Sequence, residues 1–242
     1  MKTFLEEYGI SIVVCFVVVI MLTVASPISI ATGNGAEGVM TALEEKLSGK
    51  KKPRLPRAYQ EVEWIGSSGT QYIDTNIIPN KNTKWECEVA FTDTTAWKQL
   101  FFGAGGIYNS TSFAIGVYQN YYRVGIGDGV SEGYPEITAD YNKHSFIIDK
   151  PNQSTTVDNI TKTKSAGLNK PKHIFLFALS KDTTQLISAN IYLSKLYEND
   201  VLIQNLVPCY RKSDGEIGMY DLVSKTFYTN QGAGTFTKGE DV

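Results

Sequence analysis

The sequence has few of the groups that most metal and catalytic sites need. Its 242 residues include two histidines and three cysteines, and no two cysteines form a Cys-x-x-Cys pair. A disulfide-rich scaffold and a thiolate metal site are therefore excluded. The charged share is only 20% and the net charge is −2, so we expect no nucleic-acid partner, because few phosphates could be neutralised.

Glycine and aromatic residues are plentiful, with 21 Gly, 14 Tyr and 11 Phe, and this composition favours a β-rich body with many turns. In the segment 84–91, Trp85, Cys87, Val89 and Phe91 share one face of a predicted strand. Further strands are predicted at 112–118, 122–126, 172–179, 189–197 and 201–207. Because such segments recur at intervals of about 8–12 residues, we predict one mainly β, antiparallel two-sheet sandwich over residues 58–242.

The N-terminus is different in character. Residues 10–30 carry no charge, and as a helix they would extend about 31 Å, the thickness of a bilayer's hydrocarbon core. We therefore predict a long N-terminal hydrophobic α-helix, retained in the membrane, over residues 1–32. The alternative is a cleaved signal peptide, but Glu6 and Glu7 weaken its positive region and the apolar stretch is too long.

Residues 33–57 connect the helix to the body. Val39, Leu43 and Leu47 recur at four-residue spacing, which predicts a short amphipathic segment, and a basic linker with two prolines follows. The positive-inside rule would place the basic cluster 50–57 in the cytoplasm, although it lies at the limit of that rule's reach.

The first 48 residues resemble the pilins of Tad-type type IV pili. Glu7-Tyr8-Gly9 stands just ahead of the apolar run, as a Glu-Tyr pair does in that family, and a short amphipathic tail follows. In that family a glycine-terminated basic leader precedes the glutamate; none stands before Glu7 here, unless the sequence begins after processing. The resemblance implies self-association through the helix, with Glu6, Glu7 and Tyr8 in assembly. A plain single-span anchor is the alternative.

Three segments of the body carry a second resemblance: Leu55-Pro-Arg-Ala-Tyr-Gln-Glu-Val-Glu-Trp-Ile65, Ser68-Gly-Thr-Gln-Tyr-Ile-Asp-Thr75 and Leu206-Val-Pro-Cys-Tyr-Arg-Lys-Ser-Asp-Gly-Glu-Ile-Gly-Met-Tyr-Asp-Leu-Val-Ser-Lys-Thr-Phe-Tyr228. They resemble laminin-G-like, concanavalin-A-like domains of Firmicutes surface and prophage proteins. The resemblance covers about residues 55–238. It implies a jelly-roll sandwich that often binds glycans or surface ligands. It also implies a C-terminal body outside the cell, with the chain at the cell membrane and extracellular surface.

Catalysis is not expected. His144 and His173 have no Gly-x-Ser-x-Gly elbow to work with, so a hydrolytic triad is disfavoured. Glu86 and Glu88 have the same-face spacing of a glycosidase pair, but they share their face with Lys84, which indicates a solvated outer surface.

Aromatic side chains with polar neighbours suit a sugar-binding site, because an aromatic ring packs on the apolar face of a pyranose. The candidate ligand-binding residues are Trp97, Tyr118, Asn120, Tyr121 and Tyr122. The plainer interpretation is that the tyrosines only line a sheet face.

Calcium is the one cofactor considered, since laminin-G-like domains often use it. Asp128, Glu132 and Asp140 are its candidate ligands. Ordinary turn-forming acidic residues are the alternative for these positions. Cys87 and Cys209 could form a disulfide or remain buried thiols.

These observations together predict a non-enzymatic surface protein: a pilin-like filament subunit that displays an adhesion or glycan-binding domain. The alternatives are a monomeric membrane-anchored lectin, a phage or conjugative-element structural protein, and a glycoside hydrolase.

Overall fold

The computed structural model describes residues 54–94, 99–105, 113–127, 129–167, 172–179 and 186–242. Residues 54–242 form one compact unit, which begins four residues before the expected boundary at residue 58. Within the described ranges no helix is long and apolar enough to cross a membrane. The expected helix at 1–32, with the assembly residues Glu6, Glu7 and Tyr8, lies outside those ranges.

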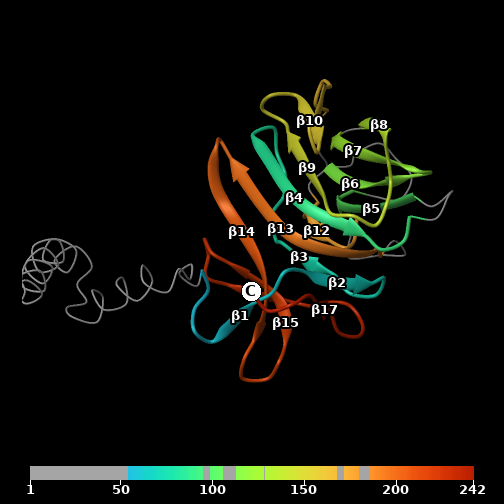
Figure 1. Cartoon of the computed structure of the whole chain (residues 1–242). Helices are drawn as coiled ribbons and strands as arrows, with labels where there is room; N and C mark the ends of the chain where they lie inside the picture. Colours follow the sequence, from blue (N-terminus) through green and yellow to red (C-terminus); the bar gives the residue numbers. More distant parts are fainter. Residues whose placement is uncertain (1–53, 95–98, 106–112, 128, 168–171, 180–185) are drawn as a thin grey trace, which may run out of the picture. The chain divides into compact units, whose positions relative to one another are not determined.

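The described residues form strands joined by turns (Figure 1). The strands are β1 Tyr59–Glu61, β2 Ile65–Ser68, β3 Ile73–Asp74, β4 Thr83–Phe91, β5 Gln99–Ala104, β6 Phe113–Tyr118, β7 Tyr121–Gly127, β8 Val130–Thr138, β9 His144–Asp149, β10 Ser154–Val157, β11 Ile160–Thr163, β12 Phe175–Leu176, β13 Ser188–Glu198, β14 Val201–Arg211, β15 Ile217–Asp221, β16 Phe227–Thr229 and β17 Thr237–Lys238.

The strands build a sandwich of antiparallel sheets. The large sheet has the order β11-β10-β9-β4-β13-β14-β15-β16; β1 also pairs with β14, and β2 pairs with both β13 and β17. The second sheet has the order β5-β6-β7-β8, and β3 pairs separately with β12. Figure 1 shows the four-stranded sheet on the side of β4 and β9. The prediction of a mainly β, antiparallel sandwich is confirmed.

Strand β4 shows how side-chain alternation builds the core. Trp85, Cys87, Val89 and Phe91 are each at most 1% exposed, whereas Glu86 and its even-numbered neighbours Lys84 and Glu88 are only half-buried. Alternate side chains point to opposite faces of a strand, so one face of β4 is apolar and the other is wet. The Trp85 indole also donates to Ser194 Oγ at 3.0 Å, so its buried N–H has a partner.

Aromatic rings join the two sheets. Trp85 of β4 stacks on Phe113 of β6 with 5.9 Å between ring centroids, and it meets Phe102 of β5 edge-on at 5.6 Å. Phe146 of β9 meets Tyr122 of β7 edge-on at 5.3 Å. Each aromatic ring contributes a large buried apolar area, so this cluster is the main link between the layers.

A smaller apolar cluster on the other face of the large sheet explains why the compact unit begins at Arg54 and not at residue 58. Leu55 is buried there with Val207, Cys209 and Tyr220. Residues 54–57 therefore belong to the body. The C-terminus lies against β1 as well, because the Val242 amide donates to the Glu61 carbonyl at 3.0 Å. Both ends of the unit meet at β1.

The segment 172–179 differs from the prediction. It was expected to be an inner strand, but only β12, Phe175–Leu176, is a strand there. Phe177 has φ +66°, a left-handed conformation that interrupts extended backbone. Beyond it the Ala178 carbonyl accepts from the Gly103 amide of β5 at 2.9 Å. The segment is apolar because it is buried, and its backbone passes from β3 to β5.

Candidate functional site

The candidate tyrosines surround the hairpin between β6 and β7. Tyr118 and Tyr121 are paired across the turn of Gln119 and Asn120. Gln119 has φ +61°, and the Asn120 carbonyl accepts from the Ala139 amide at 2.8 Å, which fixes the hairpin tip against the segment after β8. The Tyr118 and Tyr121 rings are in edge contact, 5.8 Å between centroids, and both are half-buried.

A cation completes this surface. The Arg123 guanidinium lies 4.9 Å from the centroid of the Tyr118 ring, and its Nε donates to Ser131 Oγ of β8 at 2.8 Å. The Tyr121 ring lies over Gly133: a Cβ there would be 2.9 Å from Tyr121 Cε2. The absence of a side chain at Gly133 therefore allows the ring to pack onto the strand. We call Tyr118, Tyr121 and Arg123 the aromatic face.

The structure corrects the predicted role of Tyr122. The prediction placed it in the ligand site, but its side chain points into the core and has 0% exposure. Burial raises the pKa of the Tyr122 hydroxyl to about 12. That hydroxyl accepts from the Asp140 amide at 3.1 Å. Its ring is therefore a core element and is not available to a surface ligand. Trp97 lies outside the described residues.

The expected calcium ligands are not brought together. Glu132 stands near the start of β8 and pairs with Lys164 at 3.4 Å. Asp140 follows the end of β8, where it contacts His144 and Asn142. Asp128 lies outside the described residues, and within those residues no group of three or more His, Cys, Asp or Glu side chains could hold a metal ion.

The two histidines are each held by carboxylates. His144 Nδ1 is 2.7 Å from Asp158 and its Nε2 is 2.9 Å from Asp140. Burial opposes protonation of His144, but the hydrogen bonds to Asp158 and Asp140 outweigh it, so the pKa of this imidazole is raised. His173 Nδ1 lies 2.9 Å from Asp74. These contacts tie neighbouring strands and turns together.

Glu86 and Glu88 lie on the outer face of the large sheet. Lys84 Nζ is 2.8 Å from Glu86, and Lys143 Nζ is 3.0 Å from Glu88. The Tyr197 hydroxyl also donates to Glu86 at 3.2 Å. Each carboxylate is thus partnered by a lysine.

Cys87 and Cys209 are both buried free thiols. They belong to separate apolar clusters, on opposite faces of the large sheet. The disulfide considered as one alternative is therefore not formed.

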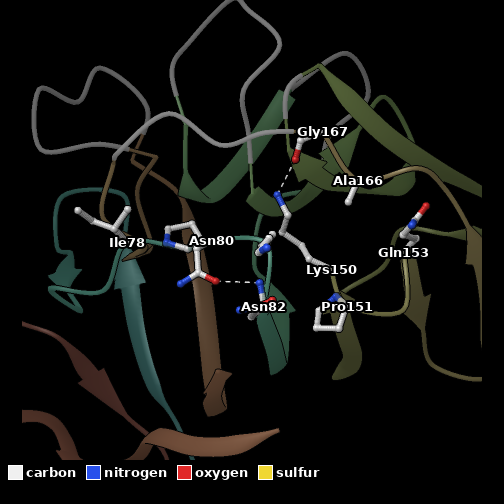
Figure 2. A pocket seen from close by; sticks show the side chains of 10 residues that line it. Ile78, Asn80, Asn82, Lys150, Pro151, Gln153, Ala166 and Gly167 are labelled. Carbon is white, nitrogen blue, oxygen red and sulfur yellow. Dashed lines mark hydrogen bonds between the residues drawn. The ribbon is translucent and has the colours of Figure 1, made fainter. Parts of the chain in front are cut away.

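A pocket of about 760 Å³ lies where the loop before β4, the turn after β9 and residues 166–167 meet (Figure 2). Its polar lining consists of two cations and three amides. They are Lys81, Lys150, Asn80, Asn82 and Gln153. Figure 2 shows Lys150 running between Asn80 on one side and Gln153 and Ala166 on the other.

Lys150 is 4% exposed, and its ammonium donates to the Gly167 carbonyl at 2.6 Å. Lys150 is not among the residues that the sequence predicts for a site. The available signal was strand parity: Phe146 and Ile148 are buried on β9, and Lys150 is the next residue in that series. A lysine at a core-facing position just past a strand end marks a place where a polar group enters the interior.

The fold and these surfaces define an antiparallel β-sandwich with an aromatic face and a separate polar pocket. No protein-family model matches the chain, and a search of curated proteins finds no significant match.

Proposed function

We propose that the chain is a non-enzymatic bacterial cell-surface protein whose body is a laminin-G-like, concanavalin-A-like jelly-roll domain for adhesion or glycan binding. The observation that carries this proposal is the aromatic face, where two tyrosine rings and an arginine lie together on the outer side of the four-stranded sheet.

The aromatic face has the components of a saccharide surface. A pyranose presents an apolar C–H face that packs on an aromatic ring, while its hydroxyls need polar neighbours. Tyr118 and Tyr121 supply rings, and Arg123 supplies donors beside them. The Ser131 contact and the packing of Tyr121 over Gly133 hold these groups before a ligand arrives, which lowers the entropy lost on binding.

In this proposal the N-terminal segment attaches the body to the cell. The uncharged run at residues 10–30 has the length of a membrane span, and Glu7-Tyr8 stands just before it, as in Tad-type pilins. We propose that copies of this helix pack together into a filament core, with Glu6, Glu7 and Tyr8 in the assembly contacts.

Glycan-array binding of the full-length protein in mild detergent tests the binding role. The test variants are Tyr118→Ala and Tyr121→Ala, with Tyr192→Ala on the large sheet as the control. Each test variant removes one aromatic ring from the proposed sugar-binding surface, so we expect each to lose about tenfold in affinity. Equal binding by the test variants and the wild type would reject the aromatic face.

Negative-stain electron microscopy of material sheared from cells tests the assembly role, with an antibody against residues 58–242. We expect labelled fibres. Antigen confined to the membrane fraction would replace the filament with a single-span anchor, and antigen absent from intact cell surfaces would reject the orientation.

A further inference from the structure

We propose that the aromatic face is regulated by proton binding at His144, which holds the tip of the β6–β7 hairpin in place through Asp140. The consequence for ligand binding rests on the proposed function. The pH dependence of the hairpin tip does not, because it is measured without a ligand. We call Asp140, His144 and Asp158 the histidine bridge.

The hairpin that carries the aromatic face is attached to the segment after β8. The Asn120 carbonyl, at the hairpin tip, accepts from the Ala139 amide at 2.8 Å. One residue further, the Asp140 amide donates to the Tyr122 hydroxyl of β7 at 3.1 Å. Two successive backbone amides therefore hold the hairpin, and they keep their positions only while the segment that contains them is fixed.

The histidine bridge fixes that segment. His144 Nε2 lies 2.9 Å from the Asp140 carboxylate, and its Nδ1 lies 2.7 Å from Asp158 in the turn between β10 and β11. Asp158 is held independently, because it also accepts from the Ser145 amide at 3.0 Å. A neutral imidazole has one N–H donor, so it can hold only one of the two carboxylates. Loss of the proton therefore breaks the connection from Asp158 to Asp140.

The other groups around His144 do not change charge near neutral pH. From β7 the Tyr122 ring packs against the imidazole with 4.7 Å between centroids, and burial raises the pKa of its hydroxyl to about 12. From β4 the apolar Val89 stands opposite His144. The neighbouring ammonium of Lys143 is paired with Glu88 at 3.0 Å.

The charges give the direction of the effect. Burial opposes protonation of His144, but hydrogen bonds to Asp158 and Asp140 prevail and raise its pKa. Burial also opposes ionisation of Asp140, but hydrogen bonds from His144 and Asn142 lower its pKa, so it stays ionised at neutral pH. The bridge is therefore complete below the ordinary histidine value of 6.5 and is lost as pH rises through the raised pKa.

Binding should follow the same direction. With the bridge complete, the hairpin tip is held before a ligand arrives, and little freedom is lost on binding. With the bridge broken, the tip must be ordered by the ligand. The aromatic face should therefore bind more tightly at pH 5.5 than at pH 8.5.

Hydrogen–deuterium exchange of the full-length protein in mild detergent tests the inference without a ligand, at pH 5.5 and pH 8.5. Rates are corrected for the intrinsic pH dependence of amide exchange. We expect the corrected rates of the Ala139 and Asp140 amides to be about fivefold higher at pH 8.5, as for loss of one partly exposed ion pair. The Gly215 amide, which donates to the Arg211 carbonyl in the turn after β14, should keep its corrected rate.

Three variants separate proton binding from a merely structural role. His144→Gln cannot titrate and should remove the pH dependence at Ala139. His173→Gln is the matched control, because His173 pairs with Asp74 outside the bridge, and it should keep the pH dependence. Asp158→Asn removes a charge that favours protonated His144, so the midpoint of the pH dependence should move to lower pH.

Three results would overturn the proposal: equal corrected rates at both pH values in the wild type, an unchanged pH dependence in His144→Gln, or an equal change at Gly215. The proposed function fails separately. If Tyr118→Ala and Tyr121→Ala leave glycan binding unchanged while Ala139 responds to pH as expected, the bridge stands and the binding role is rejected. The reverse combination rejects the bridge alone.

Discussion

His144 Nδ1 lies 2.7 Å from the Asp158 carboxylate, and this contact fastens the start of β9 to the turn between β10 and β11. Asp158 also accepts from the Ser145 amide at 3.0 Å. Asp140 contacts the other ring nitrogen at 2.9 Å, and only a protonated imidazole donates from both nitrogens. The arrangement therefore favours the charged form of His144.

Stability should depend on pH through this contact. The raised pKa of His144 means that its contribution is fully present below the ordinary value of 6.5 and is lost as pH rises through the raised value. Asp140 acts at the acid end. Burial opposes its ionisation, but hydrogen bonds from His144 and Asn142 prevail and lower its pKa. Its contribution to stability is therefore present above the ordinary value of 3.8 and is lost as pH falls through the lowered pKa.

Asp158→Asn should accordingly lower the free energy of unfolding by up to about 1 kcal/mol between pH 4 and 6.5, as for a partly exposed ion pair. The difference from the wild type should shrink at higher pH. Urea unfolding at pH 5.5 and pH 8.5 measures it. An equal difference at both values would show that the charge of His144 plays no part.

Ser194→Ala should destabilise the body by about 1–3 kcal/mol, because it leaves the fully buried Trp85 indole N–H without its partner at 3.0 Å. Denaturant unfolding followed by Trp fluorescence measures this loss. Ser145→Ala, at a half-buried position of β9, is the control and should change stability by less than about 0.5 kcal/mol. Similar losses in both variants would contradict the assigned role of the hydrogen bond.

Gly116→Ala should destabilise the four-stranded sheet. A Cβ at this position would lie 2.3 Å from the Leu100 carbonyl oxygen and 2.3 Å from Phe101 Cδ1. We expect a loss of about 1–3 kcal/mol, as for other overpacked sites. Gly215→Asn is the control, because nothing lies within 4 Å of that Cβ and Asn tolerates its φ of +74°. Thermal unfolding compares the two, and an equal effect would contradict the steric account.

The two body thiols should be inert until the protein unfolds. Burial raises the pKa of the Cys87 thiol, and it raises that of Cys209 to about 12, so little thiolate exists at pH 8. Cys15→Ser removes the third thiol, so that Ellman's reagent counts only these two. We expect no reaction in the folded protein and two equivalents in guanidinium chloride. No reaction in denaturant would reveal a disulfide.

The strands were predictable where one face of the sheet is buried and the other is wet. In β4 this contrast fixes which side chains alternate inward, so the sequence pattern and the fold agree. In β13 a register shift between Ile191 and Leu193 interrupts the alternation, and Leu193 is only half-buried. Residues 174–179 lack that contrast because every one of them is buried. Their path depends on backbone partners in β3 and β5 that are distant in the chain.

The candidate sites also divide into a part that the local sequence pattern predicts and a part that depends on residues distant in the chain. Tyr121 and Tyr122 are adjacent in a strand and must point to opposite faces, so only one of them could face a ligand. The two-residue turn places Tyr121 opposite Tyr118 and therefore sends Tyr122 inward. The Lys150 pocket was not predictable in full, because its walls come from three loops that only the folded sandwich brings together.

The meeting of the start of the body and the C-terminus at β1 has a mechanical consequence. Tension applied through the segment before Arg54 acts first on Leu55 and on a strand of three residues, whose pairing with β14 joins Tyr59 to Arg211 and Glu61 to Cys209. The aromatic core between Trp85 and Phe113 lies on the opposite side of the large sheet from that attachment. Under load we expect the β1 pairing to separate first, while the sandwich and its aromatic face stay folded.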